Sequence, residues 1–345
     1  MRDVLIPPFV SLAWVLCAVF LLVAPGWAGD GGTTAPATQA DGWRVVETLF
    51  AQPTTEANGV DARVIGEVHP EGERFYVRIG NMGEGADAAV LSWDVGRYTG
   101  FEPGDGDSPA PYQRGPSQPV EGSAVQVRGT EIGLWIDSDH PRPQRGALLP
   151  VCPAYWWWDV NRAPRPFREP DRELSFSFDL KVPTAEREGK AAVYLCAHFL
   201  FRDQRSGRQF WFGASLFDLR GADRFHDIVH VDNWEGGTRL PILFSALDER
   251  SAWLHLGPGS AHFTGVPFDK YRRFDFRVGA EELRTAVVGM KKRLPDLADA
   301  AEDPSDYQLT HFNVNPEVYA PEGSRGRLGL ALRDIRVVLL EPEVH

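Results

Sequence analysis

Apolar and polar residues alternate along much of the chain, and the alternation is sharpest between residues 174 and 182. Successive side chains of a β-strand point to opposite faces, so one face of this segment is entirely apolar. That face holds Leu174, Phe176, Phe178, Leu180 and Val182. Antiparallel strands with one solvated face alternate in this way, whereas the strands of a parallel sheet are apolar throughout. The pattern therefore predicts antiparallel sheet.

The same period predicts further strands on both sides of this segment. Two long aromatic-rich runs, Val193–Arg202 and Gln209–Leu219, are joined by a polar segment that contains one glycine, which is typical of a hairpin. The other strands are expected at Trp43–Phe50, Ala62–Val68, Arg74–Ile79, Ala88–Val95, Ala124–Ile136, His226–Val231, Tyr271–Val278 and Arg327–Leu339.

A helical period occurs in one segment, Ala280–Leu294. Its apolar residues recur every three or four positions, with acidic residues in the first turn and basic residues in the last, which suits the helix dipole. Pro295 ends the segment. We therefore expect an all-β fold, an antiparallel β-sandwich of the jelly-roll type, with one amphipathic helix in its C-terminal half. Residues 43–345 form a single domain in this interpretation, with long loops at 100–122 and 137–173.

The N-terminal residues indicate export. An apolar run from Val10 to Val23 is followed by the small residues Gly26 and Ala28, which fits a signal peptide over residues 1–28. The alternative is an uncleaved anchor, because Asp3 cancels the charge of Arg2. Residues 29–42, rich in Gly, Thr and Ala, are expected to be a flexible leader. The mature protein is then secreted or periplasmic.

Cysteines and charge limit the classes of function. Removal of the signal peptide leaves Cys152 and Cys196, which in an oxidising compartment predict a disulfide; two buried free thiols are the alternative. The sequence contains no Cys-x-x-Cys spacing, so a zinc site built from cysteines is not expected. The chain has a formal charge of −12 and no stripe of basic residues, which argues against nucleic acid and anionic membrane surfaces as partners. Eleven tryptophans exceed the needs of a core, so some are candidates for stacking on a ligand.

A row of polar residues near the C-terminus is the strongest functional signal. In the segment 311–319, apolar residues alternate with His311, Asn313, Asn315, Glu317 and Tyr319. Carboxamides that both donate and accept, beside an aromatic ring and a carboxylate, suit recognition of a hydroxyl-rich ligand such as a glycan. The alternative is a solvated outer face of the sandwich. Pro316 predicts an edge strand or a bulge at this point.

Aromatic residues in two loops extend this hypothesis. Trp156, Trp158 and Asp159 in one loop, and Trp234 in another, are candidates for stacking on and bonding to a sugar ring. The alternative is that these indoles plug one end of the core. Glycosidic cleavage needs two carboxyl groups, and Glu317 is the best first member. Asp159, Asp232 and Glu235 are candidate partners that the sequence does not rank.

Metal and cofactor chemistry finds little support in the sequence. His226 and His230 are roughly 13 Å apart on a strand, too far for one ion. The loop carboxylates are candidates only for a structural Ca²⁺, with solvated turns as the alternative. These carboxylates are Asp105, Asp107, Asp137 and Asp139. We find no phosphate-binding loop, no nucleophile elbow and no dinucleotide fingerprint, so no cofactor is expected.

The hairpin Val193–Leu219 and the final strand at 328–338 resemble the jelly roll of the concanavalin-A-like lectin and glucanase superfamily, and secondarily galactose-binding-like modules. This architectural resemblance spans about residues 124–341 and implies that the face bearing His311 to Glu317 contacts sugar. Three hypotheses follow. The first is an exported protein that binds a polysaccharide or glycoconjugate, the second a glycoside hydrolase or lyase that uses Glu317, and the third a structural protein of the cell envelope.

Overall fold

The computed structural model describes residues 42–51, 65–68, 75–78, 90–93, 123–128, 131–138, 148–150, 154–157, 163–221, 226–233, 239–321 and 323–343. All of them belong to one compact unit, Gln39–His345. The expected signal peptide, the leader and the loop 100–122 lie outside the described residues. Within the described part, no helix combines the length and apolarity needed to cross a membrane.

One sheet is built around β9 and β17, and we call it the β9–β17 sheet. Its strand order is β14-β15-β9-β17-β6-β5, and β1 also pairs with β17. These strands are β14 (His255–Leu256), β15 (Phe268–Gly279), β9 (Glu173–Glu188), β17 (Arg325–Pro342), β6 (Glu131–Asp137), β5 (Ser123–Arg128) and β1 (Trp43–Ala51). Every pair in this sheet is antiparallel.

The second sheet has β10 and β16 in its middle, and we call it the β10–β16 sheet. Its order is β12-β13-β11-β10-β16-β8-β4, with β7 also paired to β16. These strands are β12 (Ile228–Asn233), β13 (Arg239–Ala246), β11 (Gln209–Asp218), β10 (Ala192–Asp203), β16 (Tyr307–Tyr319), β8 (Ala154–Trp157), β4 (Val90–Trp93) and β7 (Leu148–Pro150). The pair β11–β13 is parallel and the others are antiparallel. A short hairpin joins β2 (Ile65–Val68) to β3 (Phe75–Arg78).

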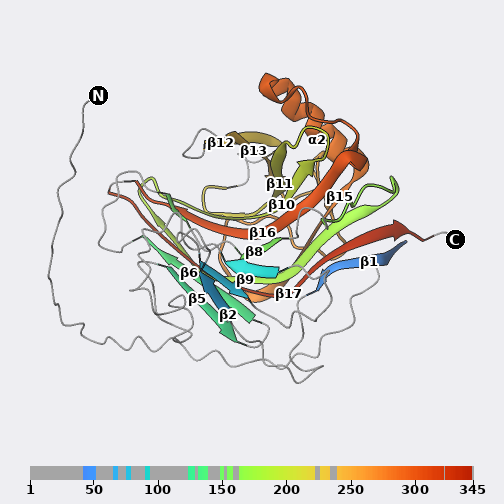
Figure 1. The fold of residues 1–345 in the computed structure, drawn as a ribbon. Coiled ribbons are helices and arrows are strands. Elements are labelled where there is room, and N and C mark those ends of the chain that lie inside the picture. The colour runs from blue at the N-terminus through green and yellow to red at the C-terminus, as the bar shows by residue number, and fades with distance from the viewer. Residues whose placement is uncertain are drawn as a thin grey trace, which may run out of the picture. The chain divides into compact units, whose positions relative to one another are not determined.

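The two sheets pack face to face around a phenylalanine-rich core, with β10 and β16 over β9 and β17 in Figure 1. The five apolar residues predicted to face inward on β9 are all fully buried. Phe176 on β9 meets Phe312 on β16 edge to face, with ring centroids 5.1 Å apart. Such aromatic pairs add to the area that they bury. The expected antiparallel β-sandwich is thereby confirmed.

The predicted helix is also present, as α2 (Ala280–Arg293). Leu283, Ala286, Val287 and Met290 form its buried face and belong to the same core as the two sheets. Its acidic first turn and basic last turn are as expected. Two short 3₁₀ helices follow, Pro295–Leu297 and Pro304–Asp306, and lead into β16.

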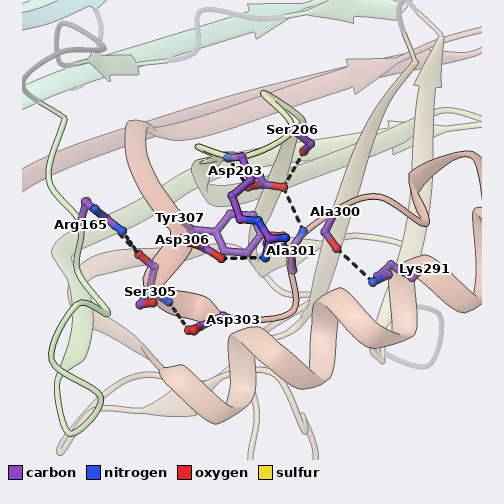
Figure 2. Close-up of polar contacts among 11 residues, drawn as sticks. Arg165, Asp203, Ser206, Lys291, Ala300, Ala301, Asp303, Ser305, Asp306 and Tyr307 are labelled. Atoms are coloured by element: carbon purple, nitrogen blue, oxygen red, sulfur yellow. Dashed lines mark hydrogen bonds and ion pairs between the residues drawn. The ribbon is translucent and has the colours of Figure 1, made fainter.

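Figure 2 shows how the connection between α2 and β16 is held in place. Asp203, at the end of β10, is fully buried and accepts hydrogen bonds from the Ala301 nitrogen (2.9 Å) and the Ser206 hydroxyl (2.5 Å). Burial opposes the charge of this carboxyl, but these bonds prevail and lower its pKa. Tyr307 donates to the Ala301 carbonyl at 2.6 Å. The start of β16 is thus tied to the end of β10, which sets the register of the pair.

Two local expectations were wrong, and the strand β13 (Arg239–Ala246) was missed. The expected strand Ala124–Ile136 is the hairpin of β5 and β6, in which Arg128 pairs with Glu131. The expected loop 137–173 contains β7 and β8. The strand β13 was not predicted because Pro241 interrupts its apolar run, and proline argues against a strand inside a sheet.

Candidate functional site

The polar row of β16 lies on the face of the β10–β16 sheet that points away from the core. Phe312, Val314 and Val318 are core residues, so the alternate positions on β16 point to the opposite side. We call this side the site face. It is not an ordinary solvated surface, because Asn313 is 3% exposed and the other four members of the row are only half exposed.

Pairing with β10 and β11 turns the row into a lattice across three strands. Residues in register on β16, β10 and β11 form four lines across the site face. The lines are Glu317–Tyr194–Asp218, Asn315–Cys196–Ser215, Asn313–His198–Gly213 and His311–Leu200–Trp211. Since β10 and β16 are central strands, these residues lie in the middle of the sheet.

In the first line, the Glu317 carboxylate accepts hydrogen bonds from two neighbouring side chains. Tyr194 donates its hydroxyl to Glu317 Oε2, and the Asn315 amide donates to Oε1. Burial raises the pKa of Glu317 to about 7, because a charged carboxyl loses its hydration among protein atoms. The side chain keeps partial exposure to solvent. Glu317 is therefore a carboxyl that takes up or releases a proton near neutral pH.

An ion pair closes the other end of this line. Asp218 is fully buried and accepts two bonds from the Arg220 side chain, from Nε at 3.0 Å and from Nη2 at 2.7 Å. The Arg220 backbone nitrogen also donates to Asp218, at 2.7 Å. The Arg220 guanidinium lies over the Tyr194 ring, 5.1 Å from its centroid. Both oxygens of Asp218 are thus occupied by Arg220.

Imidazoles and carboxamides occupy the centre of the site face. His198 Nδ1 lies 3.2 Å from the Asn313 side-chain oxygen. Burial lowers the pKa of His198 and of His311 to about 4, so both rings are neutral at physiological pH. In this state they offer hydrogen-bond donors and acceptors without charge.

Aromatic rings gather at the far end of the site face from Glu317. Trp211 contacts His198 and His311 edge to face, with centroids 6.1 and 6.4 Å away. Phe244 on β13 meets His198 at 6.4 Å. Trp211 and Phe244 are half exposed. The site face therefore combines polar groups at one end with aromatic rings at the other.

Pro316 occupies an interior strand, where neither the predicted edge nor the predicted bulge is found. On one side it pairs with Leu195 of β10. On the other side, β8 pairs with residues 311–314 and β7 with residues 317–319. Pro316 thus falls between the residues of β16 that pair with β8 and those that pair with β7.

Cys196 has a free thiol, which differs from the predicted disulfide with Cys152. The side chain is 4% exposed and points to the site face between Tyr194 and His198. Burial raises the pKa of this thiol to about 12, so it is protonated and unreactive. Cys152 lies outside the described residues.

The proposed carboxyl partner Asp232 is far from Glu317. Asp232 lies on β12 and pairs with Leu240 of β13. Its strand is four strands away from β16, and following the pairings across the sheet places Asp232 level with Gln308 of β16. On a flat sheet this separates the two Cα atoms by about 35 Å, whereas a catalytic carboxyl pair lies within about 10 Å. Asp159 and Glu235 lie outside the described residues.

The pairing of β8 with β16 gives the register of one predicted stacking residue, Trp156. Trp156 lies opposite Phe312, a core position, whereas Tyr155 and Trp157 lie opposite Asn313 and His311 of the polar row. Trp158 and Trp234 lie outside the described residues. Within the part of the chain that is described, no three His, Cys, Asp or Glu residues are grouped to hold a metal ion. Three of the four calcium candidates fall outside this part, as does the side chain of Asp137.

Tyr194, His198, Trp211 and Arg220 were not predicted as site residues. A signal existed for the first two, since between Val193 and Phe201 the apolar core positions alternate with Tyr194, Cys196 and His198. Asp218 was not predicted either. Simple alternation along β11 would place it on the core side, but a bulge in the pairing of β10 with β11 moves the later residues of β11 to the other face.

This chain was compared with known families, curated proteins and solved structures. The sequence matches no protein-family model and no curated protein. Among solved structures, it is similar to the xyloglucanase domain of NopAA, a type three effector from Sinorhizobium fredii, solved with cellobiose. The identity is 10%, the TM-score is 0.32, and the match covers 72% of this chain and 92% of that one.

Two further solved structures are similar to this chain. A family 12 xyloglucanase from Bacillus licheniformis has 5% identity and a TM-score of 0.35, with 80% of this chain and 97% of that one covered. A family 11 xylanase from Neocallimastix patriciarum has 9% identity and a TM-score of 0.28, with 64% and 96% covered. At such TM-scores, the likeness carries no argument about residues or activity.

Proposed function

We propose that the site face binds a glycan. The observation that carries this proposal is the position of the polar row, which lies half buried in the middle of a sheet, away from the core. Carboxamides, a phenol and neutral imidazoles that are clustered beside half-exposed aromatic rings match the hydroxyls and the apolar faces of sugar rings.

Charge supports a neutral glycan as the ligand. The Asp218 carboxylate is balanced by Arg220, and the imidazoles of His198 and His311 on the site face are neutral. Glu317 is the remaining ionisable group of the β16 row with a pKa near neutrality. Within the four lines of the site face, at most one charge is thus uncompensated near pH 7. The neutral hydroxyl groups of a glycan can bind to such a surface without a charged group of their own.

Cleavage of the glycan is the second candidate function. It is supported by the raised pKa of Glu317, since a carboxyl protonated near pH 7 is suited to act as a general acid. The carboxyl that shares its line, Asp218, is occupied by Arg220. A second carboxyl that is ready to act is therefore missing from the described part of the site face, which favours binding over cleavage.

The third hypothesis, a structural envelope protein, has less support. A surface for a protein partner would present a contiguous apolar patch. Among the described residues, the large apolar side chains that are strongly exposed are Val45, on β1, and Val266, in the segment before β15. A scattered valine is ordinary for a soluble surface.

A polysaccharide pull-down and a glycan array with the full chain, with product analysis of every hit, test the proposal. We expect the wild type to bind a glycan. Replacing Asn313 or Asn315 by alanine should lower the affinity about five- to tenfold, because each substitution removes one or two hydrogen bonds between a carboxamide and the glycan. Glu317→Gln should preserve binding and abolish any cleavage.

Glu131→Gln is the matched control. Glu131 also accepts a tyrosine hydroxyl, from Tyr271, but it lies on β6 in the other sheet. We expect it to change neither binding nor cleavage. Binding without new reducing ends supports a binding protein, and cleavage that Glu317→Gln abolishes supports the enzyme. No binding to any glycan would contradict both and leave the structural hypothesis.

A further inference from the structure

The contacts around Glu317 form a chain that continues well beyond the polar row. From Glu317 it passes to the Tyr194 hydroxyl, through the Tyr194 ring to the Arg220 guanidinium, and from there to Asp218. These residues come from three strands or their ends, and only Glu317 belongs to the segment that the sequence singles out. Each contact limits the freedom of the next side chain.

We propose that Arg220, anchored by Asp218, is a positioning residue that holds the Tyr194 hydroxyl against the Glu317 carboxyl. Its importance for ligand binding rests on the proposed function, but its effect on Glu317 does not.

The anchor of Arg220 is rigid. Asp218 is fully buried and holds Arg220 through two side-chain bonds and one backbone bond. The turn that carries Arg220 is closed by a bond from the Gly221 nitrogen to the Asp218 carbonyl at 3.1 Å, and Leu219 donates to Val193 at 3.1 Å. Gly221 has a φ of +94°, which favours glycine. The guanidinium therefore has one preferred place, over the Tyr194 ring.

The face of a tyrosine ring attracts a cation, and a planar guanidinium also stacks on it. Arg220 thus restricts the tilt of the ring and with it the direction of the hydroxyl. The other group that donates to Glu317 is Asn315, on its own strand. The ionisable group nearest along β10 is Cys196, which is neutral, and the residue of β7 opposite Glu317 is Pro150. Tyr194 is therefore the contact through which β10 and β11 act on Glu317.

A hydroxyl that donates to a carboxylate stabilises its charged form and so lowers its pKa. Removing the Tyr194 hydroxyl, in Tyr194→Phe, should raise the titration midpoint of Glu317 by about one pH unit. If Arg220 holds Tyr194 in place, then Arg220→Met should raise the midpoint as well. The double variant should titrate as Tyr194→Phe does, because Arg220 has nothing left to position.

The midpoint is measured on the full chain by carboxyl ¹³C NMR, with the Glu317 signal assigned from its loss in Glu317→Gln. Arg220→Lys separates positioning from charge, since lysine keeps the cation but loses the planar fork and the stacking. We expect Arg220→Lys to shift the midpoint in the same direction as Arg220→Met. An unchanged midpoint in Arg220→Lys, or shifts that add in the double variant, would overturn the proposal in favour of a direct charge effect.

Arg250 provides a matched control. It makes the same kind of contacts to Asp248, also two residues before it, with Nε at 3.1 Å, Nη2 at 2.7 Å and the backbone nitrogen at 2.8 Å. It lies in the turn after β13 and is exposed. Arg250→Met should leave the Glu317 midpoint unchanged, and a shift there would also contradict the proposal. If no glycan binds, the proposed function fails while this result stands by itself.

Discussion

Glu317 shows how burial and hydrogen bonding act on a single carboxyl in opposite directions. Tyr194 and Asn315 donate to it and favour its charge, whereas burial disfavours the charge and raises its pKa to about 7. In the unfolded chain, the same group titrates near 4.5. Folding therefore increases the affinity of Glu317 for its proton.

This shift predicts a stability difference that depends on pH. Between about pH 4.5 and 7 the folded chain holds a proton on Glu317 that the unfolded chain releases, so Glu317 lowers the free energy of unfolding as the pH rises. Glu317→Gln removes this effect. We expect its stability relative to the wild type to improve by ~3 kcal/mol between pH 5 and pH 8. Urea unfolding at both pH values measures the difference, and an equal difference at the two would contradict the pKa of about 7.

Which residues form the site was only partly predictable from the sequence. The polar row of β16 follows from strict alternation over nine residues, and the structure has all five members on one face. Tyr194 and Arg220 join this row through pairing between strands that are more than 100 residues apart in sequence. Periodicity within a segment carries no information about such pairing, because it reports a face and not a neighbour.

At the scale of elements, the approach of β10 to β11 depends on a glycine. A Cβ atom at Gly213 would lie 2.0 Å from the Ala197 carbonyl oxygen and 2.7 Å from the Cα of His198. These are backbone atoms of the neighbouring strand, so they do not move aside as a flexible side chain would. The closeness allows the His198 ring to lie over β11 in the centre of the site face.

Gly213→Ala is therefore expected to destabilise the fold by about 3 kcal/mol or more, as overpacking against backbone does. Gly289→Ala is the control, since its Cβ would meet only the Trp253 ring at 3.5 Å, an ordinary contact. In the middle of α2 it should stabilise by about 0.5–1 kcal/mol. Chemical denaturation of the two variants measures both effects, and equal stabilities would show that the strands can separate without cost.

The start of α2 is attached to the β9–β17 sheet by a histidine. His255 of β14 lies 3.0 Å from Glu282 in the first turn of α2 and 3.9 Å from Glu173 of β9. The hydrogen bond to Glu282 raises the pKa of His255, and burial raises that of Glu173. Protonated His255 separates two carboxyl groups that would otherwise face each other.

Stability from this contact should be present at low pH and lost at high pH. A histidine with a raised pKa contributes fully below its unfolded value of 6.5, and the contribution disappears as the pH rises through its folded value. His255→Gln should therefore lower the melting temperature more at pH 5.5 than at pH 9. Thermal unfolding of both proteins at the two pH values tests this, and a constant difference would contradict a role for the charge.

At the scale of the whole molecule, the fold class was predictable and the strand order was not. Alternation in β9, the β10–β11 hairpin and the helical period of α2 together required a sandwich with one helix, which is what the structure has. The central place of β16 between β10 and β8 follows from contacts across the chain. Whether a site is formed in the middle or at the rim of a sheet depends on that order.

Strand β17 (Arg325–Pro342) occupies the middle of its sheet and pairs with β9, β6 and β1, all of which precede it by more than 130 residues. During translation, each of these partners is made long before β17. Until residues 325–342 have left the ribosome, β9 and β6 each lack a neighbour and present open edges, which invite pairing with other chains. The β9–β17 sheet is therefore completed only after residues 325–342 have been made.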